Sequence, residues 1–123
     1  MKVIKESDFD TKNLNIHFDQ HKNEYKYDLR FSNIKNDDDF KKKYNEIGDT
    51  LSRKKVGSSL SDSRYVGYID KKGRSIKYDR AYNDFVVYVK NKSITLHKKS
   101  YKNYLKIRNR DFKSEFPYND EVE

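Results

Sequence analysis

The fold is decided by residues 64–98, which read RYVGYIDKKGRSIKYDRAYNDFVVYVKNKSITLHK. Apolar and polar side chains alternate in this stretch, as they do in half-buried strands, and short polar segments interrupt the alternation. The pattern predicts strands at about 64–70, 74–79, 84–90 and 93–98, joined by turns at 71–73, 80–83 and 91–92. Because connections this short join neighbouring antiparallel strands, we expect a meander of about four strands.

Two helical patterns precede the predicted sheet. Apolar residues recur at helical spacing over residues 14–27, and a second apolar stripe begins after the N-cap candidate Asn36 and ends at Leu51. The small and polar residues 52–63 indicate a loop, and residues 101–108 fit either a short helix or an edge strand. We therefore predict an α+β fold in which N-terminal helices cover one face of a small sheet and leave the other face open.

Length and composition limit the classes of protein that the chain can be. Its 123 residues allow one domain, and we expect a folded core at 14–110 with an acidic, flexible tail at 114–123. The absence of cysteine excludes disulfides, thiolate metal sites and cysteine nucleophiles. Because no apolar run approaches the roughly 20 residues of a membrane span, we expect a soluble protein with no membrane-spanning segment in this chain.

The net charge of +8 is distributed unevenly along the chain. Residues 1–50 carry a net charge of −1, residues 51–113 one of +13, and residues 114–123 one of −4. The positive charge thus belongs to the half that contains the predicted sheet. This distribution favours an anionic partner, with RNA, DNA, an acidic protein and a membrane surface all open at this point.

Strand alternation also predicts which side chains share a face. In the last strand Thr95 and His97 lie on one side and Leu96 on the other. If Ile76 points into the core with Leu96, then Lys77 lies on the same side as Thr95 and His97. The sequence therefore predicts an open, basic sheet face that contains these three residues.

The three histidines are candidates for proton transfer. His17 and His21 are four residues apart on one side of the first predicted helix, and His97 lies in the last strand. Metal-free RNA cleavage needs a base for the ribose 2′-hydroxyl, an acid for the leaving 5′-oxygen, and donors for the phosphate. The histidines, Thr95 and a lysine or arginine supply these groups, although two histidines at this spacing are also common on ordinary helix surfaces.

A zinc site is the alternative interpretation of the same histidines. His17 and His21 have the spacing with which two histidines hold one ion, and His97 would be a third ligand. No carboxylate stands out in the sequence as a further ligand, and the two helical histidines lack the glutamate of the metalloprotease motif. The sequence therefore predicts neither a metal nor another cofactor.

Taken in order, several short motifs resemble the toxin nuclease domains of the barnase, EndoU, colicin D and RelE-like (BECR) superfamily. They are HFDQHKNEY at 17–25, RYVGYIDKKG at 64–73, KYD at 77–79, NDFVV at 83–87, ITLHK at 94–98 and YKNY at 101–104. The resemblance spans residues 17 to about 108. It implies helices packed on a small antiparallel sheet whose other face binds RNA, and a monomeric, metal-independent ribonuclease that often attacks tRNA.

The resemblance also implies a cellular context. Such domains form the C-terminal part of secreted polymorphic toxins, including those of contact-dependent inhibition, and occur in phage-encoded proteins. They act in the cytoplasm of a bacterial target cell, cleave by 2′-hydroxyl transphosphorylation, and are blocked by a cognate acidic immunity protein. These properties are expectations that follow from the likeness alone.

By position, His21 matches the most characteristic histidine of that superfamily, and Thr95 matches the threonine of its late strand. The candidate catalytic residues are His17, His21, Thr95 and His97, and the candidate substrate-binding residues are Arg74, Lys77, Tyr78, Lys98, Tyr101 and Tyr104. The chain departs from the superfamily pattern at two places. His97-Lys98-Lys99 stands where Phe-Lys-Pro is common, and Lys22-Asn23 replaces the glycine usual after the second histidine.

Two other function classes fit parts of the pattern. A basic RNA- or DNA-binding module without chemistry would use the same cations, with tyrosines stacking on bases. A protein-interaction domain such as an immunity protein is the third possibility. Immunity proteins of nucleases are usually acidic because they mimic the substrate, so the net charge of +8 disfavours this class.

Overall fold

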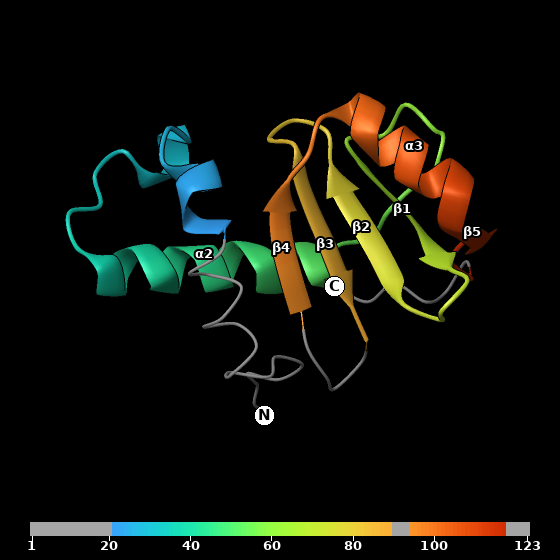
Figure 1. Ribbon diagram of the computed structural model, residues 1–123, viewed down its shortest axis with the longest axis horizontal. Helices are drawn as coiled ribbons and strands as arrows, with labels where there is room; N and C mark the ends of the chain where they lie inside the picture. The colour runs from blue at the N-terminus through green and yellow to red at the C-terminus, as the bar shows by residue number, and fades with distance from the viewer. Residues whose placement is uncertain (1–20, 90–93, 118–123) are drawn as a thin grey trace.

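The computed structural model describes residues 21–89 and 94–117, and it confirms the predicted α+β class (Figure 1). Its elements are the 3-10 helices η1 (Lys22–Tyr25) and η2 (Leu29–Phe31), helix α2 (Asp37–Ser52), strands β1 (Tyr65–Asp70), β2 (Ser75–Asp79), β3 (Asp84–Tyr88) and β4 (Ile94–Lys98), helix α3 (Tyr101–Asp111) and strand β5 (Phe112–Ser114). Within these residues, neither helix has the length and hydrophobicity needed to span a bilayer.

The predicted antiparallel meander is confirmed, and a fifth strand extends it. The strands pair in the order β4-β3-β2-β1-β5, and each neighbouring pair is antiparallel. Gly73, with φ 80°, and Asn83, with φ 62°, lie in the turns after β1 and β2, where the chain needs the left-handed conformation. The register aligns Tyr78, Phe85 and His97 in one row across β2, β3 and β4.

The beginning of the expected flexible tail is instead ordered. Ser114 ends β5, and the Glu115 carboxylate accepts hydrogen bonds from the backbone N–H of Ser59, at 2.8 Å, and from its hydroxyl, at 2.6 Å. The pairing of Ser114 with Ile69 and of Phe112 with Asp70 also covers part of the outer edge of β1. The prediction of a flexible tail is thus wrong for residues 114–117, and residues 118–123 lie outside the described part of the chain.

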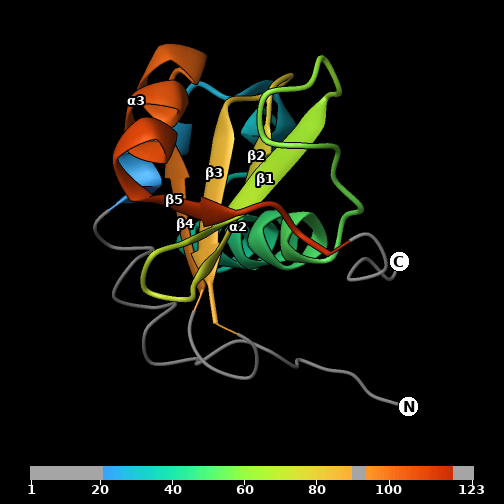
Figure 2. The same ribbon diagram turned by 90° about the vertical axis from the view of Figure 1, so that its right-hand side faces the viewer.

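Helices α2 and α3 pack on opposite faces of the sheet, which Figure 2 shows nearly edge-on. The cluster beneath α2 contains Tyr25, Phe31, Tyr44, Leu51, Val86 and Leu96, and the cluster beneath α3 contains Val66, Tyr68, Ile76, Tyr78, Phe85 and Tyr104. The second face is therefore not the open, basic surface that the sequence predicts. Helix α3 covers its β1 and β5 side, and the side chains beneath that helix are mainly apolar.

Lys77 is the clearest departure from the predicted arrangement. The register places Lys77 beside Val86, on the α2 face, and puts Ile76 in the row of Val87 and Thr95, on the α3 face. Lys77 is 2% exposed, and its ammonium donates to the carbonyl oxygens of Ser52, at 3.0 Å, and Lys54, at 2.7 Å. It therefore binds backbone carbonyls at the end of α2 and is not available to a substrate.

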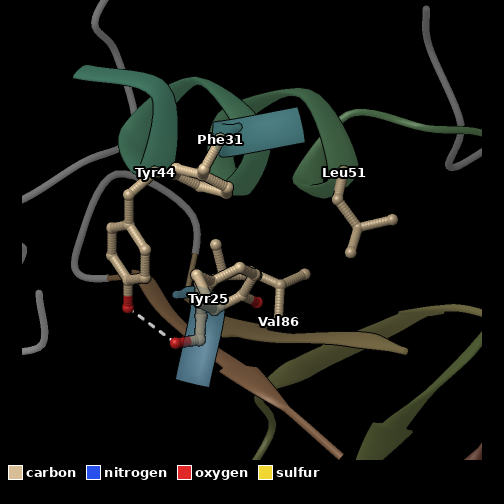
Figure 3. Packing of buried hydrophobic residues seen from close by; sticks show 6 residues of the cluster. Tyr25, Phe31, Tyr44, Leu51 and Val86 are labelled. Atoms are coloured by element: carbon tan, nitrogen blue, oxygen red, sulfur yellow. Dashed lines mark hydrogen bonds between the residues drawn. The ribbon is translucent and has the colours of Figure 1, made fainter. Parts of the chain in front are cut away.

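The N-terminal segment is held against the sheet by buried aromatic rings. Tyr25 is fully buried and packs edge-on against Tyr44 of α2 with ring centroids 5.5 Å apart (Figure 3). The Tyr44 hydroxyl donates to the carbonyl oxygen of Leu96 at 2.6 Å. In its described part, the helix expected over residues 14–27 is a short 3-10 turn, and residues 14–20 lie outside the description.

Candidate functional site

Two of the three histidines meet at the β4 edge of the sheet. The ring centroids of His21 and His97 are 4.0 Å apart, and the two planes are inclined by 74°. His21 immediately precedes η1, and His97 lies in β4 on the same face as Phe85, whose ring centroid is 6.2 Å away. Segments that are far apart in the sequence thus place two imidazoles in direct contact.

Glu24 links His21 to strand β4. Its Oε2 lies 2.7 Å from Nδ1 of His21, and its Oε1 accepts a hydrogen bond from the backbone N–H of Lys98 at 2.8 Å. Burial alone would raise the pKa of Glu24, but the hydrogen bonds from His21 and Lys98 and the nearby charge of His21 and His97 lower it below the usual value. Glu24 is therefore an ionised carboxylate at neutral pH.

The ionisation of Glu24 determines the tautomer of His21. A carboxylate can only accept hydrogen bonds, so Nδ1 of His21 must carry the proton in this contact. In the neutral imidazole the lone pair is then on Nε2. A carboxylate bound to one ring nitrogen is the arrangement that orients histidines in hydrolytic triads.

A buried ionic network holds η1 and η2 against β3 and β4. Arg30 donates to Asp28 from Nη2 at 2.7 Å and contacts Asp84 from Nη1 at 2.9 Å. Lys98 donates to Asp28 from Nζ at 2.6 Å, and both carboxylates are 1% exposed. Although burial opposes the charge, hydrogen bonds from Arg30 and Lys98 hold the pKa of Asp28 well below its usual range. The network fixes the segment that carries His21 relative to β4.

The other predicted catalytic residues are placed as follows. Thr95 lies two residues before His97 on the same face of β4, and both residues are half-buried. His17 lies outside the described residues. The structure thus brings together His21 and His97 and places Thr95 on the same face as His97.

Three of the predicted substrate-binding residues are positioned elsewhere. The side chain of Lys98 belongs to the ionic network on the α2 face, opposite His97. Arg74 precedes β2, about 13 Å along the strand from Tyr78, and pairs with Asp70 at 2.9 Å. Together with Lys77, these residues are corrections to the predicted site.

The tyrosines divide into buried and accessible rings. Tyr78 and Tyr104 are 0% exposed and stack on each other with centroids 4.7 Å apart, and burial raises the pKa of Tyr78 to about 12. Neither ring can stack on a base, so the prediction that they bind substrate is wrong. Tyr101, at the start of α3, is half-buried and stacks on Tyr104, and the guanidinium of Arg80 lies 4.6 Å from the centroid of its ring.

Two residues of this region are absent from the sequence-based candidates. Glu24 could have been found from its spacing, because a carboxylate three residues after His21 shares its side of a helical turn. Lys99 follows the predicted strand, and its ammonium lies 5.5 Å from the centroid of the Phe85 ring, which also packs against His97. Its position depends on the turn into α3, which strand alternation does not predict.

A basic groove continues from Lys99 along α3. A hollow of about 350 Å³ is lined by Lys99, Asn103, Lys106, Ile107 and Arg110. Lys106 and Arg110 are exposed, and the only carboxylate of α3 is Asp111, which pairs with Arg110 at 2.7 Å. The groove therefore presents cations on the α3 face of the sheet, which is also the face that carries His97.

The donor set of the histidine pair also fits a metal ion. His21, Glu24 and His97 each offer one ligand atom, and these atoms lie within 4.8 Å of one another. No carboxylate ligand stood out for the zinc site considered from the sequence. The fold places the carboxylate of Glu24 beside the two histidines.

None of the protein-family models, curated proteins or solved structures compared with this chain matches it, so its function is argued from the geometry of this site alone.

Proposed function

We propose that the chain is a metal-independent endoribonuclease that cleaves RNA by attack of the ribose 2′-hydroxyl on the adjacent phosphate. The single observation that supports this function best is the contact of the His21 and His97 rings at 4.0 Å, with the Glu24 carboxylate bound to Nδ1 of His21. Two imidazoles in one accessible site can supply a base and an acid at the same time.

In this mechanism, His21 is the general base. Its Nε2 takes the proton of the 2′-hydroxyl while the 2′-oxygen attacks phosphorus, and the Glu24 carboxylate stabilises the imidazolium that forms. His97, in its protonated form, gives a proton to the departing 5′-oxygen. The products are a 2′,3′-cyclic phosphate and a free 5′-hydroxyl, and proton exchange with water restores both histidines.

The phosphate needs positive charge or hydrogen-bond donors where its negative charge increases. Thr95 presents its hydroxyl on the face of His97, and the Lys99 ammonium is next to the same face, above Phe85. Both groups are positioned to contact non-bridging phosphate oxygens beside the histidine pair. The RNA strand would continue along the groove of α3, where its phosphates meet Lys106 and Arg110.

The proposed reaction predicts defined products in the absence of metal. Protein incubated with total RNA, tRNA or single-stranded RNA in EDTA should cleave it, because proton transfer by histidine needs no divalent ion. The fragments should carry 2′,3′-cyclic phosphate ends, which block ligation at the 3′ end until acid opens the ring and a phosphatase removes the resulting monophosphate. Cleavage that requires added Mg²⁺, or 5′-phosphate products, would contradict the mechanism. A preference for tRNA would agree with the resemblance described above.

The proposed RNA path predicts an effect of Lys106 on affinity. Lys106→Ala should weaken RNA binding several-fold at low salt and reduce the slope of log affinity against log salt by about 0.7–0.9, the value for one phosphate contact. Filter binding at several salt concentrations measures both quantities. Lys42→Ala is the matched control, because Lys42 is an exposed lysine of α2, the helix on the other face. Equal effects of both variants would place the RNA elsewhere.

A non-catalytic RNA-binding module is the second candidate, and the basic groove of α3 favours it equally. The two functions differ in their products, since the module would bind in a salt-sensitive way and leave the RNA intact. The toxin role, the delivery route and the acidic immunity protein stay predictions of the sequence resemblance.

A further inference from the structure

We propose that His21, Glu24 and His97 form a binding site for a zinc-type transition-metal ion, and that the ion switches off the histidine pair. The first part stands on the geometry of the three side chains. The second part rests on the proposed ribonuclease function. The ion is thus an inhibitor of the site and not a cofactor of the reaction.

The distances need only a small adjustment to enclose an ion. One ligand atom from each residue lies within 4.8 Å of the other two, while ligands around a tetrahedral zinc ion are about 3.3 Å apart. His21 Nδ1 and Glu24 Oε2 are closer than that, at 2.7 Å, because a proton now lies between them. Rotations about side-chain bonds are sufficient to reach the metal geometry, since η1 and β4 are already side by side.

The chemistry of the donors selects the class of ion. Two imidazoles and one carboxylate are a ligand set of open zinc sites, in which a water or other small ligand fills the fourth position. Imidazole nitrogens suit zinc, copper, nickel and cobalt, whereas Mg²⁺ and Ca²⁺ prefer oxygen ligands.

The surroundings favour a fixed and accessible site. The Lys98 N–H holds Glu24 Oε1 at 2.8 Å, so the carboxylate is oriented in the manner of ligands that have an outer hydrogen-bond partner. The side chains of His21 and Glu24 are 18% and 36% exposed, which leaves a path for an ion from solvent. The ligands come from two segments that the ionic network and the aromatic cluster already hold together.

Metal binding and proton transfer use the same two imidazoles. When Nδ1 of His21 binds zinc, the proton of the neutral ring lies on Nε2, which then cannot accept the proton of a 2′-hydroxyl, and a metal-bound His97 cannot become the imidazolium that protonates the leaving oxygen. Occupancy of the site therefore removes the base and the acid together.

The metal site is tested by a binding titration that does not involve RNA. Chelator-treated protein is titrated with Zn²⁺ in competition with a chromophoric chelator, and we expect one ion per chain. His97→Ala and the nearly isosteric Glu24→Gln should each weaken binding by about 100-fold or more. Glu46→Gln, an exposed glutamate of α2, is the matched control and should bind like the parent protein. Circular dichroism establishes that each variant is folded.

Every outcome of the titration is decisive. Millimolar affinity, or equal affinity in the parent and in folded His97→Ala and Glu24→Gln proteins, would overturn the site. Binding of Mg²⁺ as tight as that of Zn²⁺ would overturn the assignment of the metal class.

The inhibition is tested by adding the ion to the cleavage reaction. One equivalent of Zn²⁺ beyond the chelator should lower the rate of RNA cleavage at least tenfold, and excess EDTA should restore it. An increase of the rate on adding Zn²⁺ would overturn the inhibitory role. If the zinc-free protein does not cleave RNA, the proposed function fails, whereas the titration still decides whether the metal site exists.

Discussion

Replacing His21 by alanine lowers the rate of RNA cleavage by about 10²–10⁴-fold, the usual contribution of a general base, if the proposed mechanism holds. The loss is expected because His21 is the imidazole that Glu24 orients, through the 2.7 Å contact with Nδ1. His97→Ala should cause a loss in the same range because it removes the acid. Glu24→Gln keeps a hydrogen-bond acceptor but removes the charge, so its loss should be smaller.

Rates of RNA cleavage in EDTA, measured together with RNA affinity, separate chemistry from binding. The affinity of the His21→Ala protein should stay close to that of the parent, because the groove of α3 is unchanged. Leu29→Ala is a suitable control, since Leu29 is 83% exposed in the neighbouring 3-10 helix and belongs to neither site. Undiminished cleavage by His21→Ala would refute the site assignment, and binding without any product would favour the non-catalytic module.

The second large effect is on stability. Asp84→Ala should lower the free energy of unfolding by about 3–5 kcal/mol, which is the range for removing one partner of a buried ionic network. Asp84 is 1% exposed and contacts Arg30 at 2.9 Å and Lys98 at 3.5 Å. Without Asp84, the remaining carboxylate of Asp28 faces two buried or half-buried cations, and one positive charge is left without compensation.

Urea denaturation followed by circular dichroism measures this change. Asp62→Ala is the matched control, because Asp62 is an exposed aspartate of the loop before β1, and its replacement should change stability by no more than about 0.5 kcal/mol. A decrease of less than about 1 kcal/mol for Asp84→Ala would show that water enters the network and screens its charges.

Local signals explain why so much of the fold is predictable. The meander follows from alternation between turns, and Gly73 and Asn83 occupy the left-handed turn positions that such residues favour. The start of α2 follows from Asn36, whose side chain accepts a hydrogen bond from the N–H of Asp39 at 2.9 Å. Ser100 caps α3 in the same way through Asn103. Each of these features depends on residues within a few positions of one another.

The errors concern relations between distant segments. Alternation determines which residues of one strand share a face. It does not determine which of them lie on the same side of the sheet as a given residue of another strand. The assumption that Ile76 and Leu96 share a core therefore placed Lys77 on the wrong side. A sheet covered on both faces carries buried apolar side chains on each of them, so alternation does not single out one core face. A three-residue strand such as β5 is too short for alternation to be recognised.

The sequence predicts which residue types form the candidate site, but it does not predict which of them lie in contact. His21 and His97 are visible as titratable residues in the sequence, but their contact depends on the packing of Tyr25 and Tyr44 and on the Asp28–Arg30 pair. The spacing of Glu24 from His21 indicates their contact, but the hydrogen bond from the backbone of β4 to the other oxygen of Glu24 depends on segments that are far apart in the sequence. Tertiary structure thus adds the carboxylate that the sequence lacked.

The hydrogen bonds on the outer side of β4 have a consequence for how other proteins can approach this molecule. β4 is a terminal strand of the sheet, and its edge is where a foreign strand would add itself. There the carbonyl of Leu96 is occupied by the Tyr44 hydroxyl and the N–H of Lys98 by Glu24. A strand added along this edge would first have to displace Glu24 from the site. A protein that binds the histidine pair must therefore contact its side chains and not the backbone of β4.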